Sequence, residues 1–509
     1  MADYNQEFVA SSARTGLFVP LLTMVALFVV GAAIIIRRGL RVGFTADGEA
    51  ERDLPPQPAA RGWPRGRLAL ALGVAVVLNL MTLANLDAAA RQSISALRSD
   101  AYALAMSVAP QPVPDEENAA TYYLQAFQAL DRMYKNLDRP ENRWYKAWSD
   151  ASDSDKEEEV DYGTAEATAF VEAHQGEINL LRTGATLPHY YYDRNYGQTD
   201  VTTLLPDIQG MRGGARLLAI HARWSDIRGD TKSALADVTA MAGLARHAGE
   251  DVFAVTILVG AAIDRIAFDT LQTILRSRNP SAEELAAARV NHLFSYQRQM
   301  NRILRGEEAT ILNTMAEIDS ALAWSTPKWL GGTNSGAVSV FGLGPCYRAF
   351  VLLPMMARFR REMEHLYTCT SLPYSEFETQ RLELESNWQG GLASIAPTTS
   401  ATIETTYRAD ACNLVAYTAL AMHRYRAEHG RFPDTLEELT PEIIPIVPGD
   451  PYVEQTLRLE KTDRGWVVYS VGPDTTDDHG TPASAEQKHH VLFKGDIGFE
   501  YAEEEKAEE

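Results

Sequence analysis

Two long apolar runs near the start of the chain constrain its fold more than any other feature. Residues 17–36 and 68–86 contain no formally charged side chain. A helix of about 20 apolar residues is long enough to cross the hydrocarbon core of a bilayer. A cleaved signal peptide has a shorter apolar region, about 7–15 residues long, and a basic start. Residues 1–16 instead hold two acidic residues and one arginine. The sequence therefore predicts two transmembrane helices.

The segment between the two runs predicts their orientation. Residues 37–67 carry seven arginines against four acidic residues, and the arginines lie close to both membrane edges. Connectors of this kind remain on the cytoplasmic side. We therefore expect a membrane-embedded protein with an outer tail (residues 1–16), a cytoplasmic connector (37–67) and the bulk of the chain, beyond residue 86, outside the cytoplasm.

Charge and cysteine content narrow the possible partners. The net charge is −21 at pH 7, and nucleic-acid binding requires basic faces that displace counterions. We therefore expect no nucleic-acid partner. The three cysteines are too few for a disulfide framework. Cys346 and Cys369 could pair in an oxidising compartment, but burial as small apolar side chains is the favoured interpretation for all three, Cys412 included.

Residues 87–399 have the apolar periodicity of helices. Helices are expected over residues 118–130, 215–228, 231–247 and 252–275, and from residue 281 onwards. Asp230 is placed to cap the third of these, and Ser281 with Glu284 forms a capping box for the last. The sequence predicts a large α-helical extracytoplasmic domain.

The arrangement of these helices is left open by the sequence. Gly229-Asp230, followed by Ala234 and Ala242 eight residues apart, resembles one helix pair of a tetratricopeptide-type repeat. No repeat with a period of 34 residues is present, so an irregular bundle is favoured over a short solenoid. Residues 331–344 have loop composition, and residues 390–400 have linker composition. A domain boundary is therefore expected between residues 399 and 400.

A search for catalytic motifs finds no strong signature. His189-Tyr190-Tyr191-Tyr192-Asp193 could line a sugar or peptide cleft, but packing between helices is the favoured interpretation. Glu307-Glu308 is interpreted as a solvated helix face. His221 and His247 lie on different predicted helices and are expected to be structural rather than metal ligands.

The most suggestive group of side chains is acidic. Asp474, Asp477 and Asp478 lie in one loop, and Asp496 follows later. Calcium prefers several oxygen ligands, but the spacing is not that of an EF-hand. From spacing alone, a hydrated acidic loop is the favoured interpretation.

Signals for a small α+β domain occur over residues 400–499. An amphipathic helix over residues 410–428 is followed by Gly430, which suits a left-handed C-cap, and by Pro433. Residues 456–461 and 466–471 alternate around a turn that Gly465 closes, which predicts a β-hairpin. The final residues, 500–509, are predicted to be an acidic tail.

The order Tyr425-Arg-Ala-Glu-His-Gly-Arg-Phe-Pro433, Leu436-Glu-Glu-Leu439, Asp450-Pro451 and Tyr469-Ser-Val-Gly-Pro-Asp474 resembles the soluble domain of the major pseudopilin of type II secretion. In that family the loop after the second strand binds calcium, which implies a Ca²⁺ site at Asp474, Asp477, Asp478 and Asp496. A pseudopilin has no comparable 400-residue preceding segment. The whole chain also resembles large bacterial membrane proteins that end in this domain, which implies the bacterial inner membrane as its location.

The resulting fold prediction is mainly α: two transmembrane helices, the helical domain, and a small pseudopilin-like α+β domain. The leading functional hypothesis is a membrane-tethered interaction or scaffold protein with protein partners in the envelope. One alternative is an accessory component of a type II secretion or pilus-like machine. Another is a hydrolase or carbohydrate-binding enzyme, for which two facing carboxylates about 5–10 Å apart would be expected.

Overall fold

The computed structural model describes the chain from residue 65, with gaps. The described ranges are residues 65–139, 142–152, 160–322 without 202 and 204, 347–386 without 371, 396–462, 465–481 and 495–502. Outside these ranges lie the first apolar run, the connector up to residue 64, Cys346 and the loop over residues 331–344. The pair His489-His490, a conceivable transition-metal site whose spacing defines no coordination geometry, also lies outside them. The described residues form two compact units. The first contains residues 65–100, 312–322 and 347–358, and the second contains the remainder.

The second apolar run lies in a long helix, α2 (Arg65–Val108). Its stretch Gly73–Val108 is the one helix of the described residues that contains a window long and apolar enough to cross a membrane. Large apolar side chains stand exposed along it, including Leu70 (69%) and Leu80 (61%). A soluble surface rarely exposes so many together. The helix expected over residues 68–86 is present, and it continues for a further 22 residues to Val108.

In the first unit, an ion pair fixes a second helical segment to α2. Arg348 Nη1 donates to Asp87 Oδ1 at 2.6 Å, and the Arg348 side chain is only 6% exposed. Arg348 begins a π-helical turn, Arg348–Leu352, which continues directly into α14 (Leu353–Cys369). The short apolar segment over residues 350–356 therefore belongs to this helical run.

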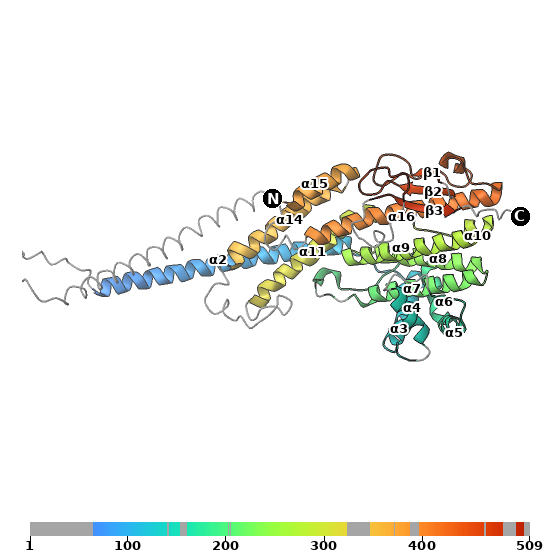
Figure 1. Cartoon of the computed structure of the whole chain (residues 1–509). Helices are drawn as coiled ribbons and strands as arrows, with labels where there is room; N and C mark the ends of the chain where they lie inside the picture. The colour runs from blue at the N-terminus through green and yellow to red at the C-terminus, as the bar shows by residue number, and fades with distance from the viewer. Residues whose placement is uncertain are drawn as a thin grey trace, which may run out of the picture. The chain divides into compact units, whose positions relative to one another are not determined.

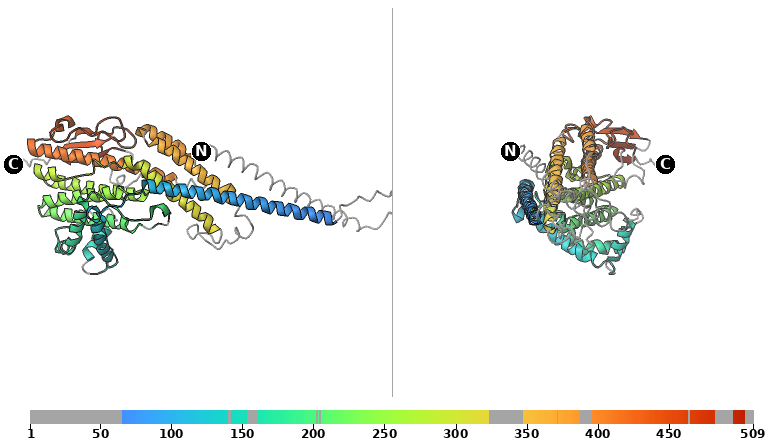
Figure 2. Two further views of the ribbon diagram at one scale, coloured as in Figure 1. Left: turned by 180° about the vertical axis from the view of Figure 1, so that it is seen from behind. Right: turned by 90° about the vertical axis from the view of Figure 1, so that its left-hand side faces the viewer.

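The second unit is built of helices covered on one side by a small sheet. Its helices are α3 (Ala120–Tyr134), α4 (Arg143–Ser152), α5 (Ala165–Ala173), α6 (Gln175–Thr186), α7 (Pro206–Ile227), α8 (Thr231–Gly249), α9 (Ala254–Ser277), α10 (Ala282–Ala287), α15 (Tyr374–Ser386) and α16 (Ala396–His429). Helix α11 (Tyr296–Leu322) belongs to this unit up to residue 311. Helices α7, α8 and α9 lie side by side, α16 lies next to α9, and the sheet lies next to α16 (Figures 1 and 2).

Local capping interactions mark the starts of two of these helices where the sequence predicts them. The Asp230 side chain accepts a hydrogen bond from Ser233 N at 3.1 Å at the start of α8. Gly229, with φ of +79°, takes the left-handed conformation between α7 and α8. Both halves of the Ser281–Glu284 capping box are formed at α10. These caps confirm the predicted starts of α8 and α10. The starts could be predicted because each donor and acceptor lies within a few residues of the other.

Helix α7 begins at Pro206, nine residues before the expected start at residue 215. Proline is well suited to a first helical position, since its missing N–H would be unpaired there. Glycines at 210, 213 and 214 look like helix breakers in the sequence. In the structure they permit close packing: a Cβ at Gly210 would collide with Phe127, and one at Gly214 with Leu181. The tertiary contact outweighs the helix propensity.

Helix α16 is buried on opposite sides. One side packs against α9 and α10, and another contacts β2 and β3. Its described part includes Ile403, Ala411, Val415 and Leu420, all at most 6% exposed. The helix starts at Ala396, so residues 396–400, expected as linker, are helical. The boundary expected between residues 399 and 400 therefore falls inside α16, in a unit that also contains α3 to α10.

The sheet has three antiparallel strands in the order β1-β2-β3. The expected hairpin is formed by β1 (Arg458–Thr462) and β2 (Gly465–Ser470), with Thr462 opposite Gly465. Strand β3 (Ile497–Ala502) was not predicted and includes residues 500–502, which were assigned to the acidic tail. Its inward residues, Ile497, Phe499 and Tyr501, alternate along the strand, and Phe499 meets Phe268 of α9 edge to face.

Close helix contacts in the second unit give a stability prediction. A Cβ at Gly306 of α11 would collide with the backbone carbonyl of Val252, which cannot rotate away. Gly306→Ala should therefore lower the stability by about 1–3 kcal/mol, the usual effect of overpacking, and lower the Tm in detergent. In Gly176→Ala the new methyl meets nothing within 4 Å. This matched control should leave the Tm unchanged or raise it slightly, and equal losses in both variants would contradict the packing described.

Candidate functional site

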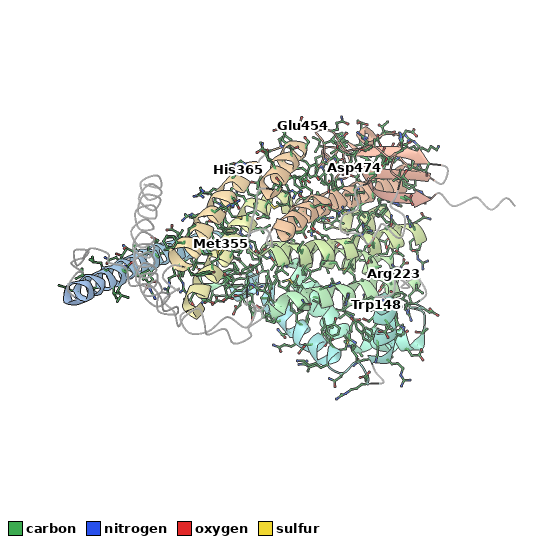
Figure 3. All side chains as sticks on the ribbon, turned by 60° about the vertical axis from the view of Figure 1, so that its left-hand side comes forward. Trp148, Arg223, Met355, His365, Glu454 and Asp474 are labelled. Atoms are coloured by element: carbon green, nitrogen blue, oxygen red, sulfur yellow. The ribbon has the colours of Figure 1, made fainter. Side chains whose placement is uncertain are left out.

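The predicted acidic site lies in the loop after β2 and at the start of β3. Asp474, seen in Figure 3, is exposed, and its Oδ1 accepts from Thr476 N at 3.0 Å. Asp477 accepts from Tyr469 Oη at 2.9 Å and from His479 N at 3.0 Å, and it is ion-paired with Arg458. Both oxygens of Asp477 are therefore engaged with other protein groups.

Asp496 is the buried member of the acidic set. It is 3% exposed, and its Oδ2 accepts from Gly480 N at 2.7 Å and from Asp478 N at 3.1 Å. Its Oδ1 is buried and accepts no hydrogen bond from the described residues. Burial raises the pKa of Asp496 to about 6; the Gly480 N–H opposes this rise, and the nearby charges of Asp478 and Asp477 add to it.

The structure thus brings Asp477 and Asp478 close to Asp496, while the hydrogen bonds of Asp474 stay within its own turn. A buried carboxylate oxygen without a donor, beside other carboxylates, is suited to a hard cation that prefers oxygen ligands. Across the described ranges, however, no group of three or more His, Cys, Asp or Glu side chains has the arrangement of a metal site. Asp496 and Asp478 fit a calcium site best, and the Ca²⁺ site stays a prediction.

A separate feature of the second unit is a groove of about 590 Å³ beside α8. It is bounded by α6 on one side and by α10 on the other, and both helices pack against α8. The size is within the range of ligand pockets. Its lining is mostly small or apolar: Ala185, Leu235, Ala236, Ala240, Ala287 and Ala288.

The polar groups of this groove come from all three helices. Lys232 is exposed at the start of α8. Arg182 of α6 donates from Nε to Asp237 Oδ1 at 2.7 Å and from Nη2 to Ser233 O at 3.0 Å, so it is held against α8. Glu283 and Glu284 are neighbours on α10, and Glu284 is engaged in the capping box. The groove therefore has no pair of facing carboxylates.

The aromatic run at residues 189–193 does not form a cleft. Tyr190 is 5% exposed, and its hydroxyl donates to Asp207 Oδ2 at 2.5 Å. Arg194, directly after the run, donates to both oxygens of Asp207 and to Asp251 Oδ2. This buried Asp–Arg–Asp cluster joins the loop to α7 and to the turn before α9. The favoured interpretation, packing between helices, is confirmed for Tyr190.

The interpretation of Glu307-Glu308 as a solvated face is wrong. Glu308 is 2% exposed and accepts a hydrogen bond from Tyr367 Oη. Glu307 Oε1 accepts from Ala254 N at 2.7 Å and so caps the start of α9. Burial raises the pKa of both carboxyls. A cap from another helix leaves no local sequence signal, because its partner lies 53 residues away.

The two helical histidines are structural, as expected. His221 Nδ1 lies 2.6 Å from Asp237 Oδ2, and His247 Nδ1 lies 2.9 Å from Tyr123 Oη. Both rings are buried. Burial also lowers the pKa of His247 to about 3. Cys369 and Cys412 are free and buried, which agrees with the favoured interpretation for these two.

Comparisons with known proteins do not add a functional assignment. A scan against family models, a search of curated proteins and a search of solved structures each gave no match to this chain.

Proposed function

We propose that the chain is a membrane-tethered interaction or scaffold protein whose second unit works outside the cytoplasm of a bacterium. The groove between α6, α8 and α10 carries this proposal. Small apolar side chains of α6, α8 and α10 form much of its lining, and such a lining suits a polypeptide segment packed along α8. Lys232 at one end favours a partner segment with an acidic residue there.

The same groove supports interaction over hydrolysis. A glycosidase needs two carboxylates that face each other across the substrate, and the two glutamates of the groove are adjacent on one short helix. The other buried carboxyls near the aromatic run are paired with Arg194. A role beside type II secretion components remains the second proposal, and its support is the resemblance of residues 411–499 to the pseudopilin domain.

A photo-crosslinking amino acid at exposed Ala236 tests the groove in intact cells. We expect one defined envelope protein to be crosslinked, because the side chain at this position points into the proposed contact. The same reagent at Glu166, exposed on α5 outside the groove, should give no such product. Ala287→Trp should fill the groove and abolish the product. Equal amounts of crosslinked product at Ala236 and Glu166 would contradict specific binding of a partner in the groove.

The proposed topology has two spans, with the connector inside and both ends outside. A cysteine at Ser484 should react with an impermeant thiol reagent in intact cells, and one at Gly48 should be protected until the membrane is opened. The parent chain controls for labelling of its own cysteines. Labelling of Gly48→Cys alone would reverse the orientation and place the second unit in the cytoplasm.

We also propose that the loop after β2 binds calcium, with Asp496 as the most deeply buried ligand. A ligand that binds only the folded state stabilises it by RT ln(1 + [L]/Kd), about 2.7 kcal/mol at a hundredfold excess over Kd. Millimolar Ca²⁺ is a suitable range for extracytoplasmic sites. The resemblance to the pseudopilin domain points to Asp474, Asp477, Asp478 and Asp496 as ligands, and the unpaired buried oxygen of Asp496 beside Asp478 favours these two.

In the full chain, Ca²⁺ should raise the Tm by several degrees, and Asp496→Asn should abolish the rise, since it replaces the buried unpaired oxygen. Asp474→Ala tests the exposed member separately. Glu454→Gln, an exposed acid in the same part of the chain, is the control and should keep the rise. An equal rise with NaCl at matched ionic strength would mean charge screening and no specific site.

A further inference from the structure

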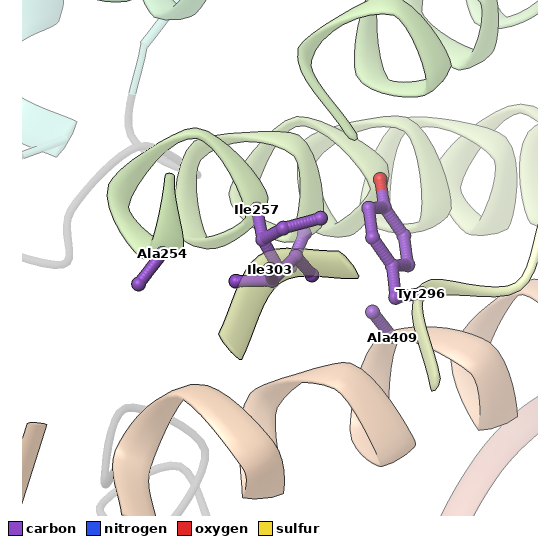
Figure 4. Close-up of a cluster of buried hydrophobic side chains, with 6 residues drawn as sticks. Ala254, Ile257, Tyr296, Ile303 and Ala409 are labelled. Carbon is purple, nitrogen blue, oxygen red and sulfur yellow. The ribbon is translucent and has the colours of Figure 1, made fainter. Parts of the chain in front are cut away.

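Two buried carboxyl groups meet where α16 joins the other helices. Asp264 of α9 is 2% exposed and Asp410 of α16 is 6% exposed. Tyr296, at the start of α11, links them: its hydroxyl donates to Asp264 Oδ2 at 2.8 Å and its backbone N–H donates to Asp410 Oδ1 at 2.7 Å. The Tyr296 ring stands between α16 and α9, with its hydroxyl directed away from Ala409 (Figure 4).

The remaining partners of Asp264 are uncharged amides. Asn291 Nδ2 donates to Oδ1 at 2.7 Å, and Asn413 Nδ2 of α16 donates to Oδ2 at 2.8 Å. No ion pair among the described residues includes Asp264. An ionised carboxylate buried without a cation is costly, and a second carboxylate nearby increases the cost. Both effects favour uptake of a proton.

Asp410 is better prepared to stay ionised. Besides Tyr296 N, it accepts from Ser295 Oγ at 2.7 Å and from Gln297 N at 3.1 Å. These donors lie at the N-terminus of α11, where a negative charge is favourable. The amides around Asp264 can rotate to present an oxygen to a carboxylic acid, but the backbone N–H groups around Asp410 cannot. Asp264 is therefore the first to take up a proton.

Charged and titratable groups near the pair lie on α9, on α11 and in the segment before α11. Arg265 on α9 binds Asp269, and exposed Arg298 on α11 lowers the pKa of Asp410. His292, in the segment before α11, has a pKa lowered by burial. Burial is the main cause that raises the pKa of Asp264 to about 7 and that of Asp410 to about 6. Because the two interact, they titrate as a pair.

We propose that Asp264, Tyr296 and Asp410 form a proton-operated latch that holds α16 against α9 and α11 more tightly in mildly acidic medium than above neutral pH. On protonation the Asp264 carboxyl gains one hydrogen and loses its negative charge, which removes the repulsion from Asp410. When Asp264 releases the proton, the carboxylates of Asp264 and Asp410 are both negatively charged and both buried between α9, α11 and α16, so they repel each other. The latch acts inside the second unit and does not require the proposed partner groove.

The sign of the effect is opposite to ordinary acid denaturation. An unfolded Asp has a pKa of about 3.9, so between pH 4 and 7 the folded state holds a proton that the unfolded state has lost. Stability from this group is then fully present below pH 4 and falls as pH rises towards 7. Opening of α16 should become up to about tenfold more frequent per pH unit in this range.

Hydrogen exchange of the full chain in detergent, measured by mass spectrometry at pH 5.5 and 8, tests the latch. After correction for intrinsic exchange chemistry, amides of α16 over residues 403–429 should open more often at pH 8, while those of α7 and α8 should change little. Asp264→Asn, which keeps the shape without the charge, should remove the difference. Asp269→Asn, at a half-exposed acid on the same helix that is ion-paired with Arg265, should retain it.

Two further results separate the latch from other causes. In isotope-edited infrared spectra of Asp496→Asn, which removes the titrating carboxyl of the acidic loop, a protonated buried carboxyl should still disappear between pH 5.5 and 8, and this tests the proposal even if Asp264→Asn does not fold. If Asp496→Asn removes the pH difference in α16 and Asp264→Asn does not, the acidic loop is its source and the latch is refuted. Exchange of α16 that is independent of pH would also refute it.

Discussion

Burial of α16 on opposite sides is the constraint on which the second unit depends. On one side this helix packs against α9 and α10, and on another it supports β2 and β3. The β1–β2 hairpin would be at best marginally stable alone, and the sheet gains stability from its third strand and from packing against α16. The helix in turn supplies Asp410, which accepts three hydrogen bonds at the start of α11. Sheet and helices are therefore parts of one core.

The sequence was sufficient where the determinants are local. The capping box at Ser281, the N-cap at Asp230, the left-handed Gly430 and the β1–β2 hairpin all depend on residues within a few positions of each other. Each is correctly predicted because it satisfies backbone groups within its own segment. The predicted helical class and the small sheet are confirmed for the same reason.

Where the determinants are distant, the sequence was insufficient. Strand β3 pairs with β2, about 30 residues earlier in the chain. The alternation of Ile497, Phe499 and Tyr501 is too short to be recognised as a strand from the sequence. Glu307 caps α9 from another helix, and Asp264 is bound by Asn413 across 149 positions. The groove beside α8 depends on α6 and α10, which only the tertiary structure brings to its sides. Of the candidate site, the sequence predicted the acidic residues but not the unpaired buried oxygen of Asp496.

The late position of α16 in the chain has a consequence for how the protein is made. Its contacts with α9 have high contact order, because Asp264 and Asn413 are separated by 149 positions, and such contacts form slowly. During synthesis, α9 emerges with the surface that α16 will cover still exposed to solvent. Transiently exposed apolar surface of this kind invites aggregation. Nascent chains that do not yet include α16 should therefore depend on chaperones more than the complete protein does.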